Sequence, residues 1–240
     1  MNVGTPSPAP AAGAGGEIEN LVGALVTPRA AFAAIARRPT WVVALLLLAA
    51  LGAVAIWSGY AKVDAAEFRS YLESMGRKLP DGVSDQQILA WTRVSSVVGA
   101  ALFAPLTYLA VAGIFLFLMR MLGGELDFRR SLAVTVHGFL PFGVAAICGL
   151  ALATLRESVT MRELESGGLV PSHLGALIEA DGAIARALLS SLDLFSVWCI
   201  ALLVLGFTTV TGLPRSKSLG AVAAVWLLGV LIKLSLAALR

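Results

Sequence analysis

Charged side chains are scarce in this sequence of 240 residues: Asp, Glu, Lys and Arg make up 14% of it, against 58% for hydrophobic residues. A soluble domain of ordinary composition holds roughly 25% charged and about 45–50% apolar residues. The shortage of charge therefore excludes an ordinary soluble enzyme. The mean hydropathy of +0.85 indicates an integral membrane protein instead.

Cysteine and histidine are also scarce, with two residues of each. Cys148 and Cys199 both lie in apolar runs, where we expect buried free thiols; a disulfide between spans is the alternative. His137 and His173 lie in different segments and cannot form the pair one helical turn apart that a zinc protease needs. We expect no metal site and no cofactor.

Several catalytic and binding motifs are absent as well. The sequence has no Gly-x-Ser-x-Gly elbow, no glycine-rich phosphate loop, no dinucleotide-binding turn and no aspartate inside an apolar run. Its net charge of +3 is small and carries no sign of the clustered basic face that nucleic-acid binding requires. We therefore expect neither enzymatic activity nor a nucleic-acid partner.

The first 16 residues contain no Lys or Arg and are mostly Ala, Pro and Gly. A signal peptide needs basic residues ahead of an apolar core, and neither is present. Residues 1–16 are therefore predicted to form a flexible tail.

Residues 17–38 predict an amphipathic helical segment at the membrane surface. Its apolar residues recur at helical spacing: Ile18, Leu21, Val22 and Leu25. Thr27 and Pro28 then supply an N-cap and a first-turn proline for a second short helix. Basic residues suited to anionic headgroups follow: Arg29, Arg37 and Arg38. The alternative is a helix packed against the end of a helical bundle.

Intervals between charged residues predict five membrane-spanning helices in a membrane domain over 39–239. The spans are expected at 39–61, 94–119, 131–155, 194–214 and 218–239. Each is long enough to cross a hydrocarbon core of about 30 Å, which takes about 20 residues. The expected fold class is therefore an all-α integral membrane protein whose five spans follow a short interfacial segment.

An odd number of spans places the two termini on opposite sides of the membrane. Eight basic residues fall on the N-terminal side and nine on the other. Those on the N-terminal side, including Arg215 and Lys217, lie in short loops close to the spans, where the positive-inside rule is strongest. We predict a cytoplasmic N-terminus and an external C-terminus.

Three polar residues within or beside the spans are candidate functional residues: His137, Asp193 and Lys233. Lys233 and Asp193 have opposite charge and compatible depth, so they either form a pair or point separately toward water. His137 lies four residues before Pro141, which frees a backbone carbonyl near position 137. Its ring either donates to that carbonyl or handles protons.

Short motifs resemble bacterial members of the Ypt-interacting protein (Yip-one domain) family. They run from Thr27-Pro28-Arg29-Ala30-Ala31-Phe32 through His137-Gly138-Phe139-Leu140-Pro141 to Ser191-Leu192-Asp193-Leu194-Phe195, Leu205-Gly206 and Pro214-Arg215-Ser216-Lys217. The resemblance implies a five-helix membrane domain with a cytoplasmic N-terminus and no catalytic residues. The composition suggests a bacterial source. The trafficking role of the eukaryotic members, which associate with small GTPases, therefore does not transfer directly.

Two functions remain open. The first is a non-enzymatic adaptor or organiser in the bacterial cytoplasmic membrane, in contact with the lipid bilayer and with another membrane protein or itself. The second is a small-solute or lipid transporter whose polar path includes His137, Asp193 and Lys233.

Overall fold

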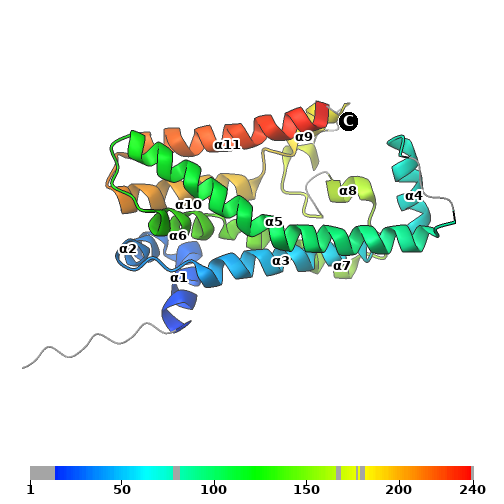
Figure 1. Ribbon diagram of the computed structural model, residues 1–240, viewed down its shortest axis with the longest axis horizontal. Coiled ribbons are helices and arrows are strands. Elements are labelled where there is room, and N and C mark those ends of the chain that lie inside the picture. Colours follow the sequence, from blue (N-terminus) through cyan, green and yellow to red (C-terminus); the bar gives the residue numbers. More distant parts are fainter. Residues whose placement is uncertain (1–13, 78–81, 166–168, 177, 179–181, 239–240) are drawn as a thin grey trace, which may run out of the picture.

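The computed structural model describes residues 14–77, 82–165, 169–176, 178 and 182–238. Five helical segments within them are long and apolar enough to cross a membrane. They are α3 (Val42–Tyr60), α5 (Asp85–Met121), α6 with α7 (Phe128–Gly138 and Leu140–Leu155), α10 (Leu194–Thr211) and α11 (Arg215–Ala238). These helices form an elongated bundle (Figure 1). The expected all-α fold with five spans is confirmed.

Shorter helices lie at both ends of this bundle. At one end, α1 (Ala14–Val26) and α2 (Pro28–Arg37) lie across the long helices (Figure 1). At the other end are α4 (Ala65–Ser74), α8 (Met161–Glu165), the 3-10 turn η1 (Leu174–Ala176) and α9 (Ala183–Leu189). We call these two regions the N-terminal end and the cap.

Helix α5 is longer than the sequence analysis indicates. Its 37 residues correspond to about 55 Å at 1.5 Å per residue, well beyond a hydrocarbon core of about 30 Å. It begins at a capping box in which Ser84 and Gln87 satisfy each other's backbone N–H groups. Arg93, taken as the boundary of the span, lies inside the helix with its guanidinium 4.1 Å from the ring centre of Trp57. A charge stacked on an aromatic ring does not end a helix.

The third span is broken at Phe139, between α6 and α7. Pro141 lies in the first turn of α7, where its missing N–H costs no helical hydrogen bond. Pro105, by contrast, lies inside α5, which continues through it and changes direction near its middle (Figure 1).

The main hydrophobic core lies toward the N-terminal end. Phe32 and Ile35 of α2 are fully buried there, and the rings of Phe115 and Phe207 lie 4.6 Å apart, centre to centre. Helix α2 is thus packed into the bundle. Pro28 begins it as expected, but the Thr27 side chain makes no capping hydrogen bond.

The cap has a small hydrophobic core of its own, formed by Val63, Phe68, Leu72 and Met161. The backbone N–H of Val159 donates to the carbonyl of Lys62 at 2.9 Å, which joins the two long loops. The backbone N–H of Met161 donates to the Glu67 carboxylate at 3.3 Å and adds to this connection, while ion pairs Arg69–Asp85 and Arg156–Glu163 hold the first and the second loop, respectively. The cap therefore forms a folded unit over the end of the bundle.

Candidate functional site

Three of the motifs that carry the family resemblance meet inside the N-terminal end. A Cβ atom at Gly206 of α10 would come within 2.8 Å of the Phe32 ring of α2 and 2.7 Å of Val134 of α6. A Cβ atom at Gly138 would come within 2.4 Å of the Leu203 side chain. Only glycine permits such close approach of helices. These motif residues therefore have a packing role.

His137 lies at this packed junction, and its side chain is almost fully buried. Its Nδ1 lies 2.9 Å from the carbonyl oxygen of Ala133. The carbonyl of His137, near which Pro141 was expected to leave an unpaired acceptor, instead receives the N–H of Phe139. The ring thus contacts a different carbonyl from the expected one, because the helix breaks at Phe139 and re-forms before Pro141.

The candidate membrane-surface residues lie at the N-terminal end, and all of them are exposed: Arg29, Arg37, Arg38, Arg215 and Lys217. Lys217 also donates to the carbonyl of Leu122 at 3.0 Å, which joins the start of α11 to the end of α5. At this end, the structure brings together exposed cations from α2 and α11, two segments far apart in the sequence.

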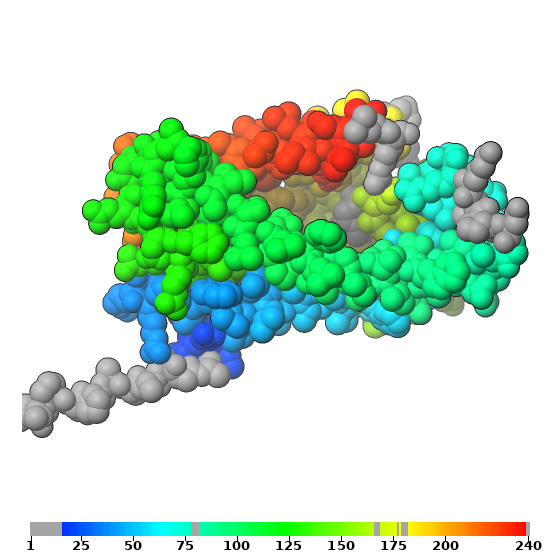
Figure 2. Space-filling model, in the orientation of Figure 1, coloured from blue at the N-terminus to red at the C-terminus, as the bar shows by residue number. Residues whose placement is uncertain are grey.

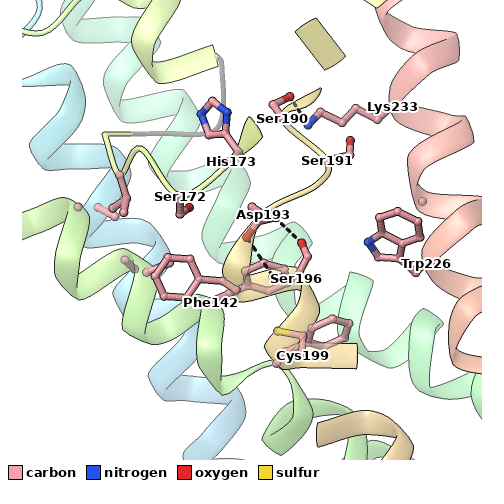
Figure 3. A pocket seen from close by; sticks show the side chains of 18 of the residues that line it. Phe142, Ser172, His173, Ser190, Ser191, Asp193, Ser196, Cys199, Trp226 and Lys233 are labelled. Atoms are coloured by element: carbon pink, nitrogen blue, oxygen red, sulfur yellow. Dashed lines mark hydrogen bonds between the residues drawn. The ribbon is translucent and has the colours of Figure 1, made fainter. Parts of the chain in front are cut away.

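A large cavity lies between the long helices on the cap side of the core, with a volume of about 860 Å³. Residues of α3, α5, α7, α10 and α11 line it, and most of the lining side chains are apolar. Figure 3 shows Phe142 and Trp226 on opposite walls, with Cys199 at the bottom of the view. Figure 2 shows the surface hollowed between α5 and α11.

The polar groups of the cavity gather at its cap end. The Lys233 ammonium donates to the Ser190 hydroxyl at 2.8 Å (Figure 3). Asp193 is the N-cap of α10: its carboxylate accepts the backbone N–H of Ser196 at 2.9 Å and also the Ser196 hydroxyl. Across the part of the chain that the structure describes, Asp193 and Lys233 form no ion pair, because the Asp193 carboxylate is turned onto its own helix.

A short backbone pairing builds this polar end. His173 and Asp193 form an antiparallel bridge, in which the N–H of Leu174 donates to Leu192 and the N–H of Leu194 donates to Ser172, each at 3.1 Å. Within the described residues, Nδ1 of His173 is buried without a hydrogen-bond partner. The pairing therefore places His173 beside Asp193 in the cavity lining.

Of the three polar candidates, the structure brings Asp193 and Lys233 into one cavity, and His137 is not among the residues that line it. Sequence reasoning missed Ser190 and His173 as partners of this site. One indication of His173 was present in the sequence, since it is a histidine within an acidic loop; the structure shows that its side chain is buried. The described residues contain no group of three His, Cys, Asp or Glu side chains able to hold a metal ion. The arrangement fits binding of a partly apolar molecule.

Comparison with known proteins places the chain in a family. A family model described as the Yip1 domain matches residues 22–236. "Membrane protein YknW" of Bacillus subtilis is 24% identical over 221 residues, which cover 92% of this chain and 90% of that protein. "Uncharacterized protein MJ0794" of Methanocaldococcus jannaschii is 27% identical over 79 residues, covering 33% of this chain and just over half, 56%, of that protein.

No solved structure matches the chain. The Yip1 match covers both the packed glycine junction and the five spans, so the resemblance seen in the short motifs extends over nearly the whole sequence. This chain is a multi-pass membrane protein of the Yip1 domain family.

Proposed function

We propose that this protein is a non-enzymatic adaptor or organiser of the bacterial cytoplasmic membrane, with α1 as its docking element. The observation that carries the proposal is the apolar outward face of α1. Ile18, Val22 and Val26 are 54%, 59% and 72% exposed. They lie four residues apart and so share one face of the helix.

The opposite face of α1 holds α1 against the bundle. Leu21 and Ala24 are buried there and pack against Ala31 of α2 and Leu45 of α3 in one cluster. Because α1 lies across the end of the bundle (Figure 1), its free apolar face can enter the headgroup region or a neighbouring membrane protein. The exposed cations of α2 and α11 favour an anionic surface at the same end.

This arrangement agrees with a cytoplasmic N-terminus, which can be tested with single cysteines. In a background with both native cysteines replaced by serine, Arg29→Cys and Glu73→Cys place one thiol at each end of the molecule. In spheroplasts, a membrane-impermeant maleimide should label the cysteine at position 73 at once and the one at position 29 only after lysis. The reverse order would overturn the orientation.

The adaptor proposal is tested by crosslinking in native membranes, followed by affinity purification and mass spectrometry. Deleting the whole of residues 17–38 is unsuitable, because Phe32 and Ile35 are part of the core. The test variant is Ile18→Ser with Val22→Ser and Val26→Ser. The control changes three exposed apolar residues of the cap to serine: Ile178, Ile184 and Leu188.

A membrane protein recovered with the wild type and the cap control, and lost with the α1 variant, would support the adaptor and identify its partner. Recovery of a second, differently tagged copy of this chain by the same criteria would identify self-association. If the wild type, the α1 variant and the cap control all recover the same crosslinked proteins in equal amounts, the proposal is contradicted.

A solute path through His137, Asp193 and Lys233 is less well supported. Asp193 and Lys233 share the cavity, but His137 lies at the packed junction where Leu203 closes against Gly138. The cavity is therefore closed toward the N-terminal end, which is the geometry of a binding site open on one side.

A further inference from the structure

The cavity between α3, α5, α7, α10 and α11 has a shape and polarity that match an amphiphile. We propose that it binds one phospholipid from the bilayer, with an acyl chain among the apolar walls and the headgroup phosphate at Lys233. The headgroup class is one that joins a phosphate to a primary ammonium. This proposal does not depend on the adaptor function or on α1.

The space is sufficient for a lipid chain. Ligand sites commonly measure about 300–1,000 Å³, and this cavity measures about 860 Å³. Small residues leave room along its walls: a Cβ atom added at Gly149 of α7 would meet only Val170, at 3.9 Å, and one added at Gly229 of α11 would meet nothing within 4 Å. The walls themselves are suited to hydrocarbon, with Phe142, Phe195 and Trp226 among the lining residues.

The opening of the cavity faces the bilayer. Residues of α5 and α11 line it, and Figure 2 shows the surface hollow between these two helices. Both helices are membrane-spanning segments, so a molecule that enters between them comes from the lipid phase. A second acyl chain of the same lipid can remain in the bilayer while the first occupies the cavity.

The polar end of the cavity supplies the headgroup chemistry. An ammonium group has three donors, and Lys233 uses one of them, on Ser190, among the described residues. A half-buried lysine inside an apolar span is costly without an anion, and a phosphate oxygen is a strong partner for it. The buried Nδ1 of His173, which lacks a partner within the described residues, offers a second polar contact.

Asp193 decides between an anionic and a zwitterionic headgroup. Its carboxylate accepts two hydrogen bonds from Ser196, out of about four lone-pair sites. With a purely anionic headgroup, Lys233 would have to balance both the phosphate and this carboxylate. A primary ammonium next to the phosphate would donate to Asp193 while the phosphate contacts Lys233, and the charges would balance.

The test is native mass spectrometry of the detergent-purified full chain with lipids of identical acyl chains. We expect one bound phosphatidylethanolamine, weaker binding of phosphatidylglycerol and the weakest binding of diacylglycerol. Lys233→Met should reduce phosphatidylethanolamine affinity by about tenfold or more, as for loss of a charged hydrogen bond. Lys62→Met, a half-buried lysine between α3 and α4 and outside the cavity lining, is the matched control and should leave affinity unchanged.

A second pair of variants tests the acyl site separately. Gly149→Leu fills the cavity, whereas Gly113→Leu of α5 adds the same side chain at a helical glycine with open space and no place in the lining. A lipid with a photoreactive acyl chain should label peptides containing Phe142 and Trp226 in the wild type and Gly113→Leu, with labelling lost in Gly149→Leu. Melting temperatures close to the wild type confirm that each variant is folded.

Equal affinity for diacylglycerol, tighter binding of phosphatidylglycerol, or unchanged binding by folded Lys233→Met would overturn the headgroup assignment. Labelling of α11 without labelling of the Phe142 peptide, unaffected by Gly149→Leu, would overturn the cavity as the acyl site. Full competition by glycerophosphoethanolamine, which has the headgroup without chains, would also overturn it.

Discussion

Replacing Gly206 by alanine tests whether α2 is part of the folded bundle. The new methyl group would lie 2.8 Å from the Phe32 ring and 2.7 Å from Val134. Carbon atoms in good contact lie about 3.5–4.0 Å apart. Each neighbour therefore has to move by about 0.7 Å or more, and both are completely buried. A rigid ring on one helix and a branched side chain on another cannot both yield cheaply.

The expected cost follows from overpacking, which typically destabilises a core by about 1–3 kcal/mol. For a chain of this size, about 1 kcal/mol lowers the melting temperature by roughly 2–4 °C, so Gly206→Ala should lower it by roughly 2–12 °C. Phe32→Leu, which shortens the side chain facing Gly206, should recover part of this loss when combined with Gly206→Ala. The single substitution Phe32→Leu, in contrast, should destabilise the fold.

A thiol-reactive fluorophore in detergent micelles measures the apparent melting temperature, since Cys199 is buried and Cys148 half-buried until the chain unfolds. Gly220→Ala of α11 is the control, because its Cβ would meet nothing within 4 Å, and it should be neutral or slightly stabilising. If Gly206→Ala melts with the wild type, or if Phe32→Leu gives no recovery, the packing of α2 on α10 is refuted.

Three further predictions concern the cap and its edges. Asp193→Asn should keep the wild-type melting temperature, since Asn caps a helix as well as Asp, whereas Asp193→Ala should cost about 0.5–2 kcal/mol; equal losses in both would indicate an ion pair with Lys233 instead. The Thr160 backbone N–H, followed by Arg156, holds the pKa of Glu163 below its ordinary value, so the folded state binds this proton more weakly than the unfolded state and gains stability at higher pH. The difference in melting temperature between wild type and Glu163→Gln should therefore be full at pH 6 and disappear as the pH falls below about 4; a difference that grows toward acid would contradict this. Ser84→Ala should speed amide hydrogen exchange in the first turn of α5, a local loss of about 0.5–2 kcal/mol, with no change in α11; unchanged exchange in α5 would argue against the capping box.

Much of the fold could be read from the sequence because membrane spans obey a simple physical rule. A segment that crosses hydrocarbon must satisfy its own backbone hydrogen bonds and largely exclude charge, so four uncharged intervals and a fifth interrupted only by Lys233 predict five spans. The capping box of Ser84 and Gln87 was also readable and would have extended the second span. This earlier start of the helix was missed because the charge of Arg93 was taken as the boundary of the span.

The candidate site depended on a long-range contact, between Lys233 and Ser190, that no local pattern contains. Asp193 and Lys233 were singled out as polar residues near one end, but their positions in the sequence fit either an ion pair or two side chains with separate partners. The structure shows separate partners: Ser196 donates to the Asp193 carboxylate, and the Lys233 ammonium donates to Ser190. The Lys233–Ser190 contact results from how the cap folds onto the bundle, whereas the Asp193–Ser196 contact is a local N-cap between residues three apart.

The sequence by itself determined that this is a membrane protein with five membrane-spanning segments, since hydropathy and charge spacing act along the chain and need no partner. Only the tertiary structure decided that α2 is core while α1 has a free apolar face, and that small residues of α7 and α11 line a cavity. Those outcomes depend on side chains from distant segments meeting in space, as Phe32 meets Gly206, and packing of that kind is a property of the assembled bundle.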